Sequence, residues 1–118
     1  MNNVKILDCT LRDGGYYNNW DFSSNFANDY LKTLTKTSVD YIEIGFRKSI
    51  NNVGSGPSGL KKVGNFLTTK ESLISKLSIP EKKKIAVMID LSDYLEKNAL
   101  KKIQKNFKNS KFSKIKLV

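Results

Sequence analysis

Four short apolar runs, separated by segments with helical spacing, constrain this chain to an α/β fold. The runs are Val4–Asp8, Tyr41–Phe46, Ile85–Ile89 and Lys114–Val118. Continuous apolar runs of this length are typical of strands that are buried in a sheet. An alternation of strand, helix and strand produces parallel neighbours. We therefore expect one buried parallel sheet, with the first run as its first strand.

The segments between these runs predict three helices. Apolar side chains at helical spacing predict a helix over Ser24–Lys36, with Asp21, Ser23 or Ser24 as its N-cap. A second, short helix is predicted by Thr68 and Glu71, which form a capping box. A third helix is expected from Ser92, where Leu91, Leu95, Ala99, Ile103 and Phe107 recur every fourth residue. Residues 49–64, rich in Asn, Ser and Gly, predict a long loop over an active site.

Four strands and three helices are about half of a closed (β/α)8 barrel, which typically needs about 250 residues. We expect residues 1–118 to form one unit of about four β/α repeats, the N-terminal half of a TIM-type barrel. An open, doubly wound sheet of the flavodoxin type is the alternative, and periodicity alone does not decide between the two.

The net charge of +10 is distributed unevenly. Residues 1–59 carry six basic and six acidic groups, so the whole excess lies in residues 60–118. Few aromatic residues lie among these lysines, and no nucleic-acid-binding motif is present. We interpret them as a solvated face rather than a nucleic-acid surface.

Metal, disulfide and membrane chemistry are limited by composition. Cys9 is the single cysteine and the chain has no histidine, which excludes an internal disulfide and a Cys-based zinc cluster and removes the commonest transition-metal ligand. No apolar run reaches the roughly 20 residues that cross a bilayer, and the N-terminus does not resemble a signal peptide. We expect a cytoplasmic protein with no membrane partner.

A polar motif, Asp8-Cys9-Thr10-Leu11-Arg12-Asp13-Gly14-Gly15, follows the first predicted strand. Two carboxylates and an arginine, with two glycines that let a loop turn sharply, place oxygen ligands and a cation at the C-terminal mouth of a parallel sheet. Such a group suits an oxyacid held on a metal. The alternative is a surface ion pair of Arg12 beside a glycine turn.

The stretch Asp8-x-Thr10-Leu11-Arg12-Asp13-Gly14 resembles the signature of the metal-dependent barrels related to hydroxymethylglutaryl-CoA lyase, isopropylmalate synthase and 4-hydroxy-2-oxovalerate aldolase. Ile42–Phe46 is similar to the second strand of that family, and Tyr16–Phe22 is similar to its aldolase-like branch. The likeness extends from Lys5 to Val118, nearly the whole chain.

The resemblance implies roles for particular residues. The aspartate matching Asp13 binds a divalent metal, Mn2+ or Mg2+, with two histidines of a His-x-His pair that this chain lacks. The arginine matching Arg12 faces the oxygen that becomes an enolate, where a cation stabilises the developing charge. The reaction is then a retro-aldol cleavage in which a base removes the 4-hydroxyl proton of a 2-oxo acid and pyruvate enolate leaves.

Two positions leave alternatives open. Tyr16 stands where the 4-hydroxy-2-oxovalerate aldolases carry a histidine base, so the base is Tyr16, another residue or water. Glu43 either orients a metal-bound water or pairs with Arg12. We interpret Asp8 as a cap of the following turn and Asp90 as a helix N-cap, and expect Asp8, Arg12 and Glu43 to cluster at the C-terminal edge of the sheet.

The sequence therefore predicts a fragment of a carbon–carbon lyase. Arg12, Glu43 and Tyr16 are its candidate catalytic residues, Asp13 its metal ligand, and a 2-oxo acid its substrate. We expect weak or absent metal binding and no catalysis by this chain alone, and completion of the barrel by a second copy or a complementary C-terminal half. The alternative is a non-catalytic half-barrel whose Lys-rich face binds an acidic partner or nucleic acid.

Overall fold

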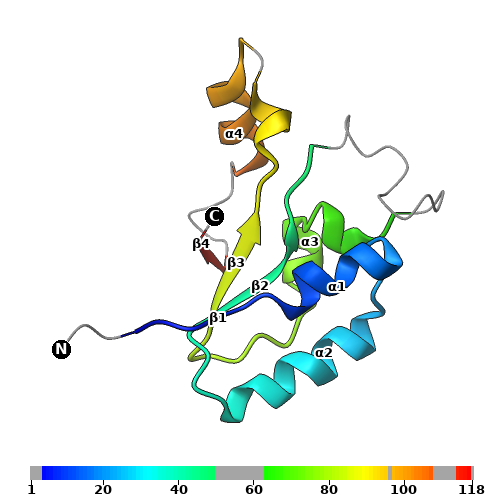
Figure 1. The fold of residues 1–118 in the computed structure, drawn as a ribbon, viewed down its shortest axis with the longest axis vertical. Coiled ribbons are helices and arrows are strands. Elements are labelled where there is room, and N and C mark those ends of the chain that lie inside the picture. The colour runs from blue at the N-terminus through cyan, green and yellow to red at the C-terminus, as the bar shows by residue number, and fades with distance from the viewer. Residues whose placement is uncertain (1–3, 50–62, 96, 108–113, 118) are drawn as a thin grey trace.

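The computed structural model describes residues 4–49, 63–95, 97–107 and 114–117 (Figure 1). Its sheet contains β1 (Leu7–Asp8), β2 (Tyr41–Phe46), β3 (Lys84–Met88) and β4 (Ile115–Leu117), all parallel and in the order β1-β2-β3-β4. The parallel, sequential pairing is as predicted. In the flavodoxin order the first strand lies between the second and the third, whereas here β2 lies between β1 and β3.

Strands β2 and β3 form the centre of the core. Ile42 and Ile85 are partners in register, and both are fully buried, as are Ile44 and Val87. Burial of such side chains contributes about 1.5–3 kcal/mol each. The apolar runs of β2 and β3 therefore fold as the sequence predicted.

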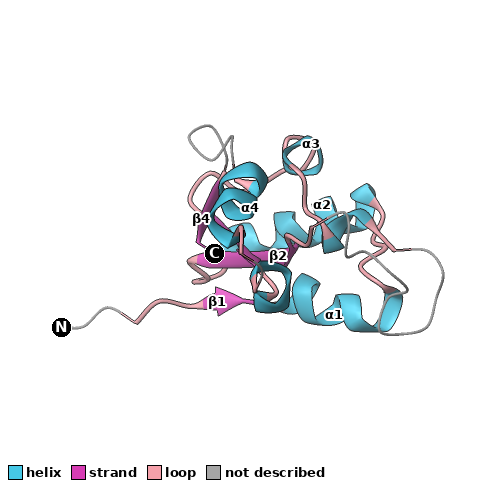
Figure 2. Cartoon of the chain, turned by 90° about the horizontal axis from the view of Figure 1, so that it is seen from above, coloured by secondary structure: helices cyan, strands magenta, loops and turns pink. Residues whose placement is uncertain are grey.

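Strand β1 differs from the expected buried strand over Val4–Asp8. Only two residues pair, and Val4, Ile6 and Leu7 are 85%, 43% and 40% exposed. Within the described part of the chain, β1 has a strand neighbour on one side only, so nothing covers the rest of this apolar run. Figure 2 shows residues 4–6, the loop just before β1, leading away from the helices.

Helix α2 (Ser24–Thr33) forms as predicted and continues as a 3-10 turn over Leu34–Lys36. Its N-cap is Ser23, whose hydroxyl oxygen accepts a hydrogen bond from the Phe26 amide at 3.1 Å. Ala27 and Leu31 are fully buried against the sheet-side core. The helical spacing thus identified both the helix and its buried face.

Helix α1 (Thr10–Asn18) replaces the sharp glycine loop that the sequence predicted after β1. The Asp8 carboxylate starts it by accepting hydrogen bonds from the Thr10 amide (3.2 Å) and hydroxyl (3.0 Å). Gly15 lies inside the helix, and this position requires glycine because a Cβ there would stand 2.0 Å from the Trp20 ring. The helix ends in the left-handed region at Asn19 (φ 55°), and Trp20 has φ 57°.

Helix α3 (Glu71–Ile74) is shorter than predicted, and the Thr68–Glu71 capping box is wrong. The helix begins after Lys70 without a side-chain cap, and the Thr68 hydroxyl instead donates to the carbonyl of Asn65 at 3.4 Å. Thr68 is the C-cap of a preceding 3-10 turn over Asn65–Leu67 rather than the N-cap of α3.

The third predicted helix is broken into a 3-10 turn, Leu91–Tyr94, and helix α4 (Ala99–Asn106). Asp90 is the N-cap, as predicted, and accepts the Ser92 amide at 3.0 Å. The apolar residues at every fourth position do not form a buried face, because Leu91 and Leu95 are 70% and 75% exposed and α4 contains no buried residue. Figure 1 shows α4 apart from α1, α2 and α3, beyond the C-terminal end of β3.

The predicted loop over 49–64 lies mostly outside the described residues, which include only Ser49, Val63 and Gly64 of it. None of the helices in the described ranges combines the length and the apolar character that crossing a membrane requires.

Candidate functional site

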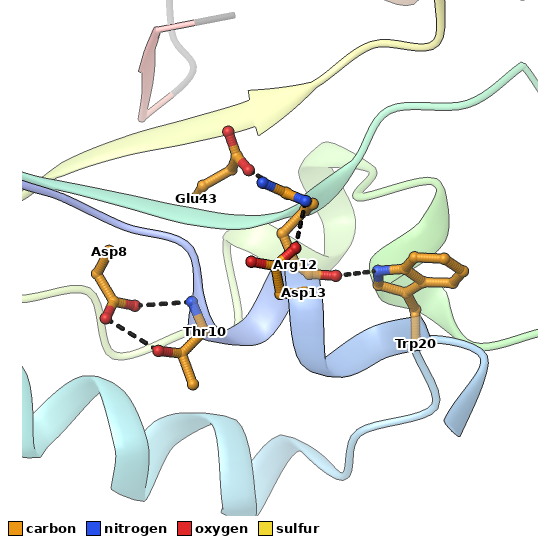
Figure 3. A network of polar contacts seen from close by, with 6 residues as sticks. All are labelled: Asp8, Thr10, Arg12, Asp13, Trp20 and Glu43. Atoms are coloured by element: carbon orange, nitrogen blue, oxygen red, sulfur yellow. Dashed lines mark hydrogen bonds and ion pairs between the residues drawn. The ribbon is translucent and has the colours of Figure 1, made fainter. Parts of the chain in front are cut away.

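Arg12, Asp13 and Glu43 meet where β1 passes into α1 (Figure 3). Arg12 and Asp13 lie near the start of α1, and Glu43 lies on the central strand β2. The Arg12 Nε donates to Glu43 Oε1, and its Nη1 donates to Asp13 Oδ1. The Arg12–Glu43 pair, which the sequence left as one of two alternatives for Glu43, is therefore formed.

The three side chains differ in exposure. The Glu43 and Arg12 side chains are 9% and 17% exposed, whereas Asp13 is 63% exposed. Burial by itself lowers the pKa of Arg12, but the hydrogen bond and negative charge of Glu43 outweigh it and raise the pKa above its usual value. Arg12 is thus a fixed cation, held from the sheet side by Glu43 and bordered on the solvent side by Asp13.

Cys9 precedes the helix and lies beside the same charges. Burial, followed by the negative charge of Glu43, raises the pKa of the Cys9 thiol. A raised pKa favours the protonated thiol at neutral pH, and the thiolate is the form that attacks or binds metals. The raised pKa therefore disfavours Cys9 as a nucleophile in this site.

Trp20 is a positioning residue that the sequence reasoning missed. It is 1% exposed, and its indole Nε1 donates to the Arg12 carbonyl at 2.9 Å. A ring in this place holds the backbone that carries Arg12. A signal was available in the sequence: two successive glycines, one of which leaves the space for the chain's only tryptophan.

Tyr16 lies one helical turn after Asp13 on α1 and is 45% exposed. Residues three apart on a helix are neighbours on its surface. The ring of Tyr16 packs edge to face on Trp20, with centroids 4.8 Å apart, and on Phe46 at 6.3 Å. The structure therefore places Tyr16 beside Asp13, with its ring anchored by aromatic contacts.

Asp8 does not join this cluster. Its carboxylate accepts hydrogen bonds from Thr10 and, at 2.9 Å to each oxygen, from the Tyr30 hydroxyl on α2. Figure 3 shows it apart from Arg12 and Glu43. The expected cluster of Asp8, Arg12 and Glu43 is wrong in this respect, because Asp8 is committed to the turn and to α2.

A metal site requires several donor side chains that are grouped around one point. Among the residues that the structure describes, no three histidine, cysteine, aspartate or glutamate side chains are grouped so as to hold a metal ion. Asp13 has an exposed carboxylate, and one of its oxygens contacts Arg12. The described part of the chain thus offers one candidate oxygen ligand and does not complete a site.

A second feature lies at the opposite, N-terminal end of the strands. An open groove of about 770 Å3 is lined by Tyr41, Ile79, Pro80 and Glu81, together with four lysines, Lys83, Lys84, Lys114 and Lys116. Lys84 Nζ lies 5.4 Å from the centroid of the Tyr41 ring, and Lys83 Nζ donates to the carbonyls of Thr37 and Val39. Four of the 15 lysines in residues 60–118 therefore gather around one hollow.

Comparison with known proteins gives one informative likeness. No protein-family model matches this chain, and no curated protein matches it. Among solved structures it is similar to the "N-terminal domain of a putative aldolase from Bacteroides vulgatus", with 33% identity and a TM-score of 0.69. The match covers 90% of this chain and 32% of that one, so this chain spans about a third of its length. The likeness supports an aldolase-like relationship.

Proposed function

We propose that this chain is the N-terminal half of a (β/α)8-barrel aldolase that makes or breaks a carbon–carbon bond in a 2-oxo acid. The observation that carries the proposal is the buried Arg12–Glu43 pair beside exposed Asp13, at the end of β1. Barrel enzymes carry their active sites at the C-terminal ends of their strands. The sequential parallel order of the sheet and the likeness to an aldolase domain support the same interpretation.

In this proposal Arg12 binds the oxygen on which negative charge develops as the enolate forms. A cation fixed in advance stabilises such charge without having to reorganise during the reaction. Glu43 fixes the direction of the guanidinium through Nε, and Trp20 holds the Arg12 backbone. Tyr16, next to Asp13 on α1, is the candidate that removes or returns the hydroxyl proton.

A divalent metal, Mn2+ or Mg2+, would supply Lewis-acid polarisation of the keto oxygen when bound. We propose Asp13 as one of its ligands, with the others outside this chain, because the described residues provide no complete set. The chain alone is then inactive, and its partner is a complementary half-barrel.

The proposal is tested by completing the barrel. Residues 1–118 are fused to the part of the Bacteroides vulgatus chain that follows the matched region, and exchange of the pyruvate methyl hydrogens with D2O is followed by NMR with Mn2+ present. We expect exchange by the folded chimera. The R12Q substitution should slow it by at least about 100-fold, and D29N, an exposed change on α2, should leave it unchanged. A folded chimera without exchange, or an R12Q chimera as active as its parent, would refute the proposal.

A second candidate function is a binding module, which the four-lysine groove favours. By strand alternation Lys114 and Lys116 lie on the side of β4 opposite Ile115, which packs in the core, and both lysines are exposed. The lysines of one groove would repel the lysines of a second copy that docked groove to groove. We therefore propose an acidic polypeptide as the occupant.

Sedimentation with polyglutamate, and separately with a single-stranded oligonucleotide, tests the module. We expect polyglutamate to bind and the K84M/K116M double variant to bind it at least fivefold more weakly. The K32M/K101M variant, which loses the same charge at exposed sites that do not line the groove, should bind as the parent does. Equal losses in the two variants would show nonspecific charge attraction, and preference for the oligonucleotide would favour a nucleic-acid partner.

A further inference from the structure

A second pocket, of about 400 Å3, lies at the other end of the sheet from the lysine groove. Its lining includes Arg47 and Lys48, which follow β2 directly, Lys70 and Ser72 from the α3 region, and Lys105 of α4. The Arg47 amide donates to the carbonyl of Met88, the last residue of β3, at 2.8 Å. The pocket therefore opens at the C-terminal ends of β2 and β3.

Arg47 forms a fixed base for this pocket. It is 4% exposed, and it donates to the carbonyls of Thr69 (2.7 Å from Nη2) and Asn106 (3.2 Å from Nη1). Its Nη2 also pairs with Glu71 Oε1 at 2.9 Å. One buried side chain thus ties β2, the start of α3 and the end of α4 together, so the walls of the pocket are formed before any ligand arrives.

Of the four cationic side chains that line the pocket, two form ion pairs with described acidic residues and two do not. Arg47 is paired with Glu71, and Lys48 Nζ is paired with Asp90 Oδ2 at 2.8 Å. Lys70 and Lys105 are exposed, and neither forms an ion pair with a described acidic residue. They belong to different elements and line the same hollow, so the pocket carries an excess of two positive charges.

We propose that this pocket binds the phosphate group of a small phosphorylated molecule, with Lys70 and Lys105 as its cations and Ser72 as a hydroxyl donor. A phosphate monoester carries about −1.5 to −2 charge at pH 7, which matches this excess. Pockets of about 300–1,000 Å3 are typical of small-molecule sites. Parallel α/β proteins bind ligands at the carboxyl ends of their strands, where this pocket lies.

The test uses the whole chain and phenyl phosphate as the probe. Backbone amide shifts are followed by NMR at constant ionic strength, with sodium chloride as the reference titration. We expect saturable shifts at residues 47, 70–72 and 105. The K70M/K105M variant should bind at least tenfold more weakly, whereas K32M/K82M, which loses the same charge at exposed sites away from the pocket, should stay within twofold. Unchanged urea midpoints confirm that the variants fold.

Two results would overturn the proposal. One is a set of shifts that are spread over the lysines generally and do not saturate, and the other is an equal loss of binding in the two double variants. The R12Q variant distinguishes this pocket from the proposed aldolase site, because Arg12 does not line the pocket and R12Q should bind phenyl phosphate like the parent. Failure of the proposed catalysis would therefore not contradict phosphate binding, and failure of phosphate binding would not contradict the proposed catalysis.

Discussion

Replacing Gly15 by alanine should displace Trp20 from the core. The new Cβ would lie 2.0 Å from Trp20 Cδ1 and 2.4 Å from Cγ, so the ring, which is 1% exposed, must move. Movement would weaken its hydrogen bond to the Arg12 carbonyl and its edge contacts with Tyr16 and Phe46. The neighbouring Gly14 is a matched control, because a Cβ there meets only Phe22 Cζ, at 3.6 Å.

The expected magnitude follows from three contributions. Overpacking of a core costs about 1–3 kcal/mol, and the loss of the indole hydrogen bond costs about 0.5–1.5 kcal/mol. Alanine in place of a helical glycine returns about 0.5–1 kcal/mol. We therefore expect G15A to lower the free energy of unfolding by about 0.5–4 kcal/mol, and G14A to raise it by up to about 1 kcal/mol.

Urea unfolding followed by tryptophan fluorescence measures both variants, and the chain's single tryptophan reports directly on the displaced ring. G15A should also shift the emission of the folded state to longer wavelength as Trp20 gains solvent. Equal unfolding midpoints for G14A and G15A, with unchanged emission, would refute the packing argument.

Three further predictions concern the charged groups. E43Q should destabilise the fold by about 1–3 kcal/mol in urea titrations because it removes the buried counter-ion of Arg12 and leaves only the exposed Asp13, whereas R12M/E43M should recover most of the loss; no recovery would refute this. The Lys48 hydrogen bond, with those from Ser92, lowers the pKa of Asp90 to about 2, so its contribution to stability is present above pH 4 and is lost as the pH falls towards 2; D90N should remove that part of the pH dependence of Tm. Calorimetry should detect only weak Mn2+ binding through Asp13, and micromolar affinity would contradict an incomplete site.

Periodicity and apolar runs predicted the parts of the fold that are buried on both faces. β2 and β3 are enclosed, so their composition alone identified them. α2 has one buried stripe, and its spacing shows it. α1 could not be predicted in this way, because its two glycines are typical of a turn and their reason, the volume of Trp20, lies in tertiary packing.

The sequence predicted which residues form the candidate site, but only part of how they are arranged. Arg12 and Glu43 are 31 positions apart in sequence and meet only because β1 and β2 are neighbours. Asp8 was expected with them, yet Tyr30 of α2 takes up its carboxylate, and no local pattern connects those two residues. The break before α4 was not predicted, because apolar residues recur at helical spacing through it. Leu91 and Leu95 nevertheless stay exposed, since no described element packs against them.

The strand pairing has a consequence for how the chain folds. Leu7 pairs with Tyr41, Tyr41 with Lys84, and Ile85 with Ile115, so every contact that builds the sheet joins residues tens of positions apart. Chains dominated by such distant contacts must close long loops before any contact stabilises them, and they fold slowly. During synthesis, β1 leaves the ribosome well before its partner and remains an unpaired apolar edge until β2 follows.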